Sequence, residues 1–131
     1  SIQNTMKIYE DNGEVWTLVH AKIGHGANID SIELVSISDD GMRLASLVGK
    51  NGKKFVRIYQ DNGTAWEIVY QDITSESTLG TLKSALMSTN GKRVVVQLSQ
   101  EDNEAKSRFI QVFEDNGDSW EAVHEVIKVG E

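Results

Sequence analysis

The motif Asp-Asn-Gly-x-x-Trp occurs three times in this chain of 131 residues, each time between two runs rich in apolar and β-branched residues. Asn-Gly in that setting is the strongest short signal of a β-hairpin, because both central residues of a type I′ turn need positive φ. With Asn-Gly as the two loop residues, each motif predicts a directly opposed aromatic pair that pins the register. We therefore expect all three tryptophans in the packing between sheets. The predicted pairs are Tyr9 with Trp16, Tyr59 with Trp66, and Phe113 with Trp120.

The spacing of the tryptophans indicates a repeated structural unit. The first two are 50 residues apart and the last two are 54 apart, a period typical of solenoids, propellers and arrays. A second hairpin signal lies between the motifs, with Asp-Gly as its turn in 35–45 and Asn-Gly in 85–95. An isoleucine, at Ile23, Ile73 and Ile127, follows each tryptophan by seven residues and predicts a repeated apolar peg.

These signals predict ten strands in five hairpins and no extended helix, because no segment shows apolar residues at helical spacing. The chain is expected to form a single all-β domain over 1–131, with an isolated hairpin at 5–20 and four-stranded units at 31–70 and 81–124. The tryptophan hairpins carry apolar residues on both faces. A sheet of that kind must be covered on both sides, which stacked four-stranded sheets achieve.

The run from Val35 to Ala45, followed by Val56 to Trp66, resembles the blade repeat of β-propellers. Blades of that family read roughly S-V-S-L-S-x-D-G-x-R-V-A-I-G and then V-R-V-Y-x-x-x-G-x-x-W. Two units match over most of their length and a third matches in half. The resemblance implies propeller-type antiparallel blades used as a scaffold or binding surface, and it carries over no catalytic residue. The sequence departs from the pattern at Ser46, Gln97 and Ser99.

About two and a half blades make an incomplete ring, since a closed propeller needs at least about four. Two interpretations follow: a piece of a longer propeller, or a chain that associates with itself by completing blades or a ring. We favour self-association, because the chain starts shortly before a predicted strand and stops at Glu131, soon after another. A head-to-tail ring and a two-fold dimer both satisfy this expectation.

The charge of the chain is acidic, with 13 Lys and Arg against 20 Asp and Glu and a formal net charge of −7. This balance disfavours binding to nucleic acid or to an anionic membrane, both of which need a basic surface. No cysteine is present, so disulfides and a thiolate nucleophile are excluded. No apolar run approaches the ~20 residues that span a bilayer. The partners we expect are a second copy of the chain and, beyond it, a protein or glycan ligand.

Histidines are the first candidates for chemistry. His20 and His124 occupy the position that Tyr70 fills in the middle unit, and hairpin counting places them opposite Thr5 and Phe109. An aromatic role at the edge of the core is expected, because a metal site would need further converging ligands. His25, between two glycines, is the candidate for a ligand loop together with Asp30, either as a ligand or as a general base.

Two charged clusters have structural explanations of their own. Asp39 and Asp40 lie at a predicted turn, where Asp is favoured for its bonds to the local backbone. Lys50, Lys53, Lys54 and Arg57 form a basic cluster that predicts either a docking patch for an acidic partner or charges that protect a sheet edge.

The motifs of common enzyme classes are absent from the sequence: it has no Walker-type loop, nucleophile elbow or dinucleotide fingerprint. We therefore predict no catalytic residue, cofactor or metal, and a non-enzymatic module for binding or self-assembly. The alternatives are a carbohydrate-binding module that uses exposed aromatics and polar loops, and a small hydrolase or lyase that uses His25.

Overall fold

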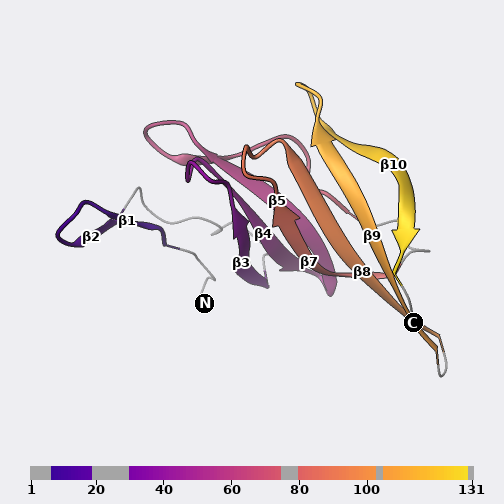
Figure 1. The fold of residues 1–131 in the computed structure, drawn as a ribbon. Helices are drawn as coiled ribbons and strands as arrows, with labels where there is room; N and C mark the ends of the chain where they lie inside the picture. Colours follow the sequence, from indigo (N-terminus) through magenta and orange to yellow (C-terminus); the bar gives the residue numbers. More distant parts are fainter. Residues whose placement is uncertain (1–6, 19–29, 75–79, 103–104, 130–131) are drawn as a thin grey trace.

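The computed structural model describes residues 7–18, 30–74, 80–102 and 105–129, which form ten strands and contain no helix. The prediction of an all-β chain is confirmed. The strands lie in three antiparallel sheets, each in chain order (Figure 1). Consecutive strands pair antiparallel inside each sheet, and a glycine lies in the turn of every such pair except β8–β9.

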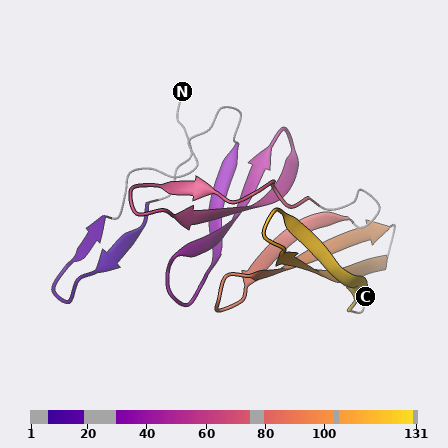
Figure 2. The ribbon, with the colours of Figure 1, turned by 90° about the horizontal axis from the view of Figure 1, so that it is seen from above.

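The N-terminal hairpin consists of β1 (Tyr9–Asp11) and β2 (Trp16–Leu18). It lies at one end of the molecule, and the second sheet lies at the other (Figure 2). The first sheet is formed by β3 (Ser31–Ile37), β4 (Arg43–Lys50), β5 (Lys53–Asp61) and β6 (Trp66–Ile68). The second sheet is formed by β7 (Thr81–Met87), β8 (Arg93–Asp102), β9 (Ala105–Asp115) and β10 (Trp120–Lys128).

The register of the tryptophan hairpins differs from the prediction. Asp11 pairs with Trp16, so the loop has four residues where the type I′ turn would have two. Its Asn12 side-chain oxygen accepts hydrogen bonds from the N–H groups of Glu14 and Val15, both at 3.0 Å. Within this loop only the glycine has positive φ. An Asx-type turn therefore satisfies the loop backbone with one left-handed residue.

The same register occurs in the other two tryptophan hairpins, where Asp61 pairs with Trp66 and Asp115 with Trp120. The predicted aromatic pairs are therefore wrong. The residues that Tyr9, Tyr59 and Phe113 oppose are Leu18, Ile68 and Ala122.

A type I′ geometry does occur, at Asn51-Gly52 between β4 and β5. Both residues have positive φ, 53° and 77°, and Lys50 directly opposes Lys53 across the turn. The β3–β4 and β7–β8 hairpins share one loop. The N–H of Ser38 donates to the carbonyl of Arg43 at 2.8 Å, and that of Ser88 donates to Arg93 at 2.9 Å.

The main core lies between the first and second sheets, where β7 packs against β3, β4 and β5. The first sheet and the segment after it contribute Ala45, Leu47, Val56, Ile58, Val69 and Ile73. The second sheet contributes Leu82, Ala85, Met87, Val94, Val96, Leu98 and Trp120. Full burial of an aliphatic or aromatic side chain contributes about 1.5–3 kcal/mol, so this shared core holds the two sheets together.

The opposite face of the first sheet carries a smaller cluster around Leu44 and Tyr59, against which Ile8, Ile32 and Trp66 pack. Ser46 lies in the same strand as Leu44 and is fully buried. Its hydroxyl donates to the carbonyl of Arg57 at 3.0 Å, which satisfies a polar group where the propeller pattern has an apolar one.

The three tryptophans differ in burial although they share one motif. Trp120 is 3 % exposed in the shared core, and Trp66 is half-buried against the smaller cluster. Trp16 is 70 % exposed, so the expectation that it packs between sheets is wrong. The physical reason is that, among the described residues, no sheet covers the face of the N-terminal hairpin that carries Tyr9, Trp16 and Leu18, all exposed.

Candidate functional site

The predicted ligand loop is only partly described. His25 and His20 lie outside the described residues, as does the peg Ile23. A carboxylate oxygen of Asp30 accepts a hydrogen bond from the N–H of Asn51 at 2.8 Å. The backbone N–H of Asp30 donates to the carbonyl of Gly49 at 2.7 Å. Asp30 therefore supports the type I′ turn between β4 and β5.

Of the two aspartates predicted at this turn, Asp40 has the structural role expected of it. Asp40 accepts the N–H of Met42 at 2.9 Å and the hydroxyl of Ser38 at 2.8 Å. These hydrogen bonds lower the pKa of Asp40. No second carboxylate converges on this turn among the described contacts, and the described residues contain no group of three or more His, Asp or Glu placed to hold a metal ion.

His124 does not oppose Phe109, which pairs instead with Lys128. The pairing of β10 is interrupted between Val123 and Ile127, and His124 is exposed with a left-handed φ of 64°. Tyr70, at the same position of the middle unit, has φ 59° and packs against the shared core. The prediction assumed a two-residue loop and regular strands, whereas the four-residue loop shifts the register and the irregularity after Val123 shifts it again.

The basic cluster is divided by the fold. Lys50, Lys53 and Lys54 lie at the β4–β5 turn, whereas Arg57 turns to Asp72 and forms a two-bond ion pair, with Nε to Oδ1 at 2.8 Å and a second nitrogen to Oδ2 at 2.9 Å. The hydrogen bonds that Arg57 donates to Asp72 raise the pKa of Arg57. Arg57 therefore stabilises the first sheet and adds nothing to a docking patch.

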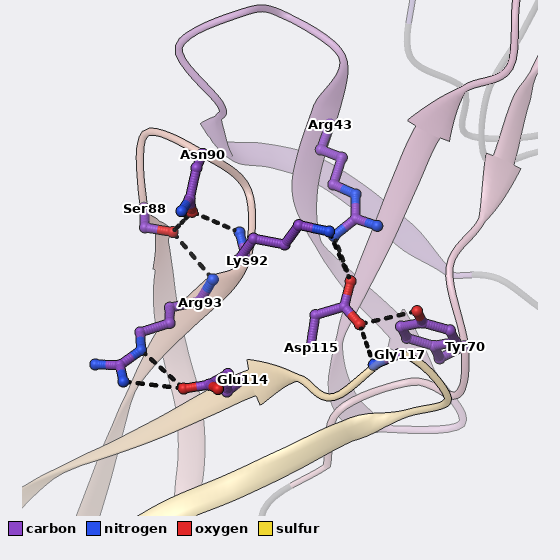
Figure 3. Close-up of a pocket in the computed structure, with 9 residues that line it drawn as sticks. All are labelled: Arg43, Tyr70, Ser88, Asn90, Lys92, Arg93, Glu114, Asp115 and Gly117. Atoms are coloured by element: carbon purple, nitrogen blue, oxygen red, sulfur yellow. Dashed lines mark hydrogen bonds and ion pairs between the residues drawn. The ribbon is translucent and has the colours of Figure 1, made fainter.

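A polar cluster lies where the two sheets meet, around the carboxylate of Asp115 (Figure 3). One oxygen accepts the Arg43 guanidinium at 2.9 Å, and the other accepts the Tyr70 hydroxyl and the Gly117 N–H, each at 2.8 Å. Lys92 lies 3.7 Å from the same carboxylate. Arg43 lies in the first sheet and Tyr70 directly follows it, whereas Asp115 lies in the second sheet. These contacts therefore join the first sheet to the second.

Trp120 reinforces this junction from the apolar side. Its indole N–H donates to the carbonyl of Val69 at 3.0 Å. Its ring meets Tyr70 edge-on, with centroids 5.9 Å apart, and the Arg43 guanidinium lies 5.8 Å from the ring centroid. Edge-on aromatic pairs and cation–π contacts each add to the burial of the ring.

The titration of the junction follows from its contacts. Burial by itself would raise the pKa of Asp115, but the hydrogen bonds from Gly117, Tyr70 and Arg43 outweigh it and hold that pKa below its ordinary value. The bond to Asp115 raises the pKa of Tyr70. Both groups are thus moved away from neutrality, where a general acid or base works best.

A cavity of about 540 Å³ opens beside this cluster, lined by Arg43, Tyr70, Ser88, Asn90, Lys92, Arg93, Glu114, Asp115 and Gly117. The side chains of Lys92 and Arg93 are more than half exposed at its rim. The lining offers hydrogen-bond donors and acceptors to a polar ligand. The residues that line it include no cysteine and no histidine.

Sequence reasoning missed this junction, although a signal for it was present. In the 35–45 and 85–95 hairpins an arginine, Arg43 or Arg93, stands two residues after the turn glycine. An aspartate is the first residue of each Asp-Asn-Gly-x-x-Trp motif. The structure shows that Arg43 and Asp115 bind each other although 72 positions of the chain separate them.

The described residues contain no helix of the length and apolarity that crossing a membrane requires. Comparisons with protein-family models, with curated proteins and with solved structures found no match to this chain.

Proposed function

We propose that this chain is a non-enzymatic, β-propeller-like repeat module that acts through binding and self-association. The observation that carries the proposal is the outer face of the second sheet, defined as the face turned away from the first sheet. It exposes apolar side chains whose counterparts in the first sheet lie in the shared core. Counterparts are residues 50 or 54 positions apart, the two spacings of the tryptophan motif.

The contrast is largest at the isoleucine pegs. Ile73 is 2 % exposed in the shared core, and its counterpart Ile127 is 54 % exposed. Ile127 opposes Ile110, as Ile73 bridges to Val56. The fully or nearly buried Ala45, Val56, Ile58 and Val69 have as counterparts the half-buried Val95, Ile110, Val112 and Val123.

These side chains form a continuous surface. Leu86, Val95, Val112 and Val123 oppose one another across all four strands, which places them in one row on the same face. Leu86, at the edge of this row, is strongly exposed. A contiguous apolar sheet face of this kind is typical of an interaction surface.

Two copies of the chain would associate for the same physical reason that the two sheets pack together inside one chain. The first sheet buries its apolar face against the second, and the second sheet presents a similar face to solvent. Propeller-type blades satisfy both faces by stacking, and a partner sheet would satisfy this one in the same way.

A second candidate function is recognition of a polar ligand such as a glycan, favoured by the polar cavity at the junction. The third alternative, a hydrolase or lyase that uses His25, stays a prediction because His25 is not among the described residues. Its proposed partner Asp30 is engaged with the backbone of Asn51.

The test is the mass of the purified chain by light scattering over a range of concentrations. We expect a mass above 14.5 kDa that rises with concentration. Ile127→Lys should weaken association, because it places a charge on the outer face. Met42→Lys is the matched control, since Met42 is about equally exposed but lies in the β3–β4 loop.

A monomer of 14.5 kDa at every concentration would overturn the self-association proposal. A glycan array and a broad substrate screen then separate the alternatives. Glycan binding lost in Lys92→Ala would favour the cavity, and turnover lost in His25→Ala would favour the enzyme.

A further inference from the structure

The contact between the two sheets has a receiving side and an inserted side. The receiving set consists of Arg43, Val69 and Tyr70, at the end of the first sheet. The inserted set consists of Asp115 and Trp120, from one tryptophan hairpin. Arg43 and Tyr70 bind the carboxylate at 2.9 and 2.8 Å, and the Val69 carbonyl accepts the indole N–H at 3.0 Å.

The counterparts of the receiving set are Arg93, Val123 and His124, beside the outer face of the second sheet. Arg93 and Arg43 use the same atom toward counterpart residues: Nε of Arg43 donates to Gln60 at 2.8 Å, and Nε of Arg93 donates to Glu114 at 3.0 Å. A second nitrogen of Arg93 also lies 2.9 Å from Glu114. Glu114 is the counterpart of Gln60.

The backbone of the second receiving set also matches the first. His124 has φ 64° and Tyr70 has φ 59°, a backbone conformation that residues other than glycine rarely adopt. The same unusual turn therefore presents His124, whose ring N–H is a donor like the Tyr70 hydroxyl. His124 is exposed and Val123 is half-buried.

The inserted set recurs two repeats earlier, 104 positions before Asp115 and Trp120, as Asp11 and Trp16 in the N-terminal hairpin. Asp11 pairs with Trp16 as Asp115 pairs with Trp120, and each carboxylate accepts the N–H of the glycine two residues on at 2.8 Å. Trp16 is the most exposed large apolar residue described, at 70 %. Its hairpin lies at the opposite end of the molecule from the outer face (Figure 2).

We propose that the N-terminal hairpin of a second copy docks on the outer face of β7–β10, head to tail, as the Trp120 hairpin docks on the first sheet. Trp16 of one copy then donates its indole N–H to the Val123 carbonyl of the other. Asp11 pairs with Arg93 and accepts from His124. This inference rests on the proposed self-association and gives it a direction and a set of contacts.

The charges agree with this occupant. The inserted side carries a carboxylate and the receiving side carries the guanidinium of Arg93, which Asp11 would share with Glu114, 2.9 Å from Arg93 in the same chain. Two identical receiving sides would bring Arg93 against Arg93, which disfavours a two-fold contact through this surface. Trp is also one of the residue types enriched at the hot spots of protein interfaces.

The test measures self-association by sedimentation velocity, with circular dichroism as the check that each variant is folded. Trp16→Ala should weaken association roughly thirtyfold, the loss typical of an interface hot spot. Asp11→Arg and Arg93→Glu should each weaken it, because each brings like charges together. Lys53→Glu is the matched charge reversal at the β4–β5 turn, away from the contact, and should leave association unchanged.

Mixing the two charge-reversed variants tests whether the copies associate head to tail. Asp11→Arg and Arg93→Glu chains mixed in equal amounts should associate again, because alternating copies restore an opposite-charge pair at every contact. The double variant should also associate.

The outcomes separate the two proposals. A parent chain that is monomeric throughout overturns self-association, and the head-to-tail contact with it. A parent chain that associates while Trp16→Ala and Arg93→Glu behave like the parent overturns only the head-to-tail contact. Loss in the single variants without rescue in the mixture overturns the pairing of Asp11 with Arg93.

Discussion

The indole N–H of Trp120 donates to the carbonyl oxygen of Val69 at 3.0 Å, which joins a side chain of the second sheet to the backbone that follows the first. The Val69 N–H is itself bonded to the carbonyl of Ile58 at 2.8 Å, so the acceptor is held in place. Both residues are buried, and the bond is therefore shielded from water. Loss of either partner would leave a buried polar group unsatisfied.

The first prediction concerns the unequal weight of the tryptophans in stability. Trp120→Ala should lower the free energy of unfolding by about 3–5 kcal/mol, because it empties part of the shared core. Trp16→Ala should change it by less than about 0.5 kcal/mol, because the side chain is exposed in the single chain. Urea unfolding in dilute solution measures both. Equal midpoints for Trp120→Ala and the parent would contradict the prediction.

The second prediction concerns acid. The side chain of Asp115 is 3 % exposed, and its contacts hold its pKa below the ordinary value of 3.8. The unfolded chain therefore binds this proton more readily than the folded chain, and stability falls as pH drops from about 4 through the folded pKa. Asp115→Asn should flatten this part of the profile of unfolding midpoint against pH.

Asp118→Asn serves as the control for the acid experiment, since Asp118 is exposed in the same loop. It should keep the slope of the parent. An Asp115→Asn profile parallel to that of the parent would show that the carboxylate does not couple folding to pH.

The third prediction concerns two glycines with nearly the same backbone. Gly80 has φ 102° and Gly63 has φ 100°. A Cβ at Gly80 would collide with the carbonyl oxygen of Ser99 and lie 3.0 Å from the Gln100 nitrogen, whereas at Gly63 it would meet nothing within 4 Å. The positive φ costs both alanine variants about 1–2 kcal/mol.

Gly80→Ala should cost about 1–3 kcal/mol more than Gly63→Ala, because the clash forces β7 away from β8. Thermal unfolding of the two variants measures the difference, in which the shared backbone strain cancels. Equal losses would show that β7 shifts without cost.

The fourth prediction concerns the ion pairs. Asp72→Ala should lower the free energy of unfolding by about 1 kcal/mol or more, because it leaves the largely buried Arg57 without its two hydrogen bonds. Glu114→Ala removes the partner of Arg93 in an ion pair that is more exposed than the pair of Arg57 with Asp72, and it should cost less than about 1 kcal/mol. Urea midpoints compare them, and the reverse order would contradict the role given to Arg57.

The amino-acid sequence by itself determined the local features of this fold. Turn residues such as Ser38 and Gly41, and β-prone runs between them, predicted the strands and the all-β class, because turn chemistry acts over a few residues. The same local logic predicted the wrong tryptophan register. Asn-Gly is compatible with a two-residue turn and with a four-residue Asx turn, and at Asn12 the side chain's bonds to two N–H groups accompany the longer loop.

Only the tertiary structure decided which copy of a repeated residue is buried and which is exposed. Trp16 and Trp120 stand in the same motif, and Ile73 and Ile127 follow their tryptophans by the same distance, yet one of each pair is buried and the other is exposed. Burial depends on whether a second sheet lies against the face that carries the residue. That contact joins positions as far apart as Arg43 and Asp115, so no local pattern specifies it.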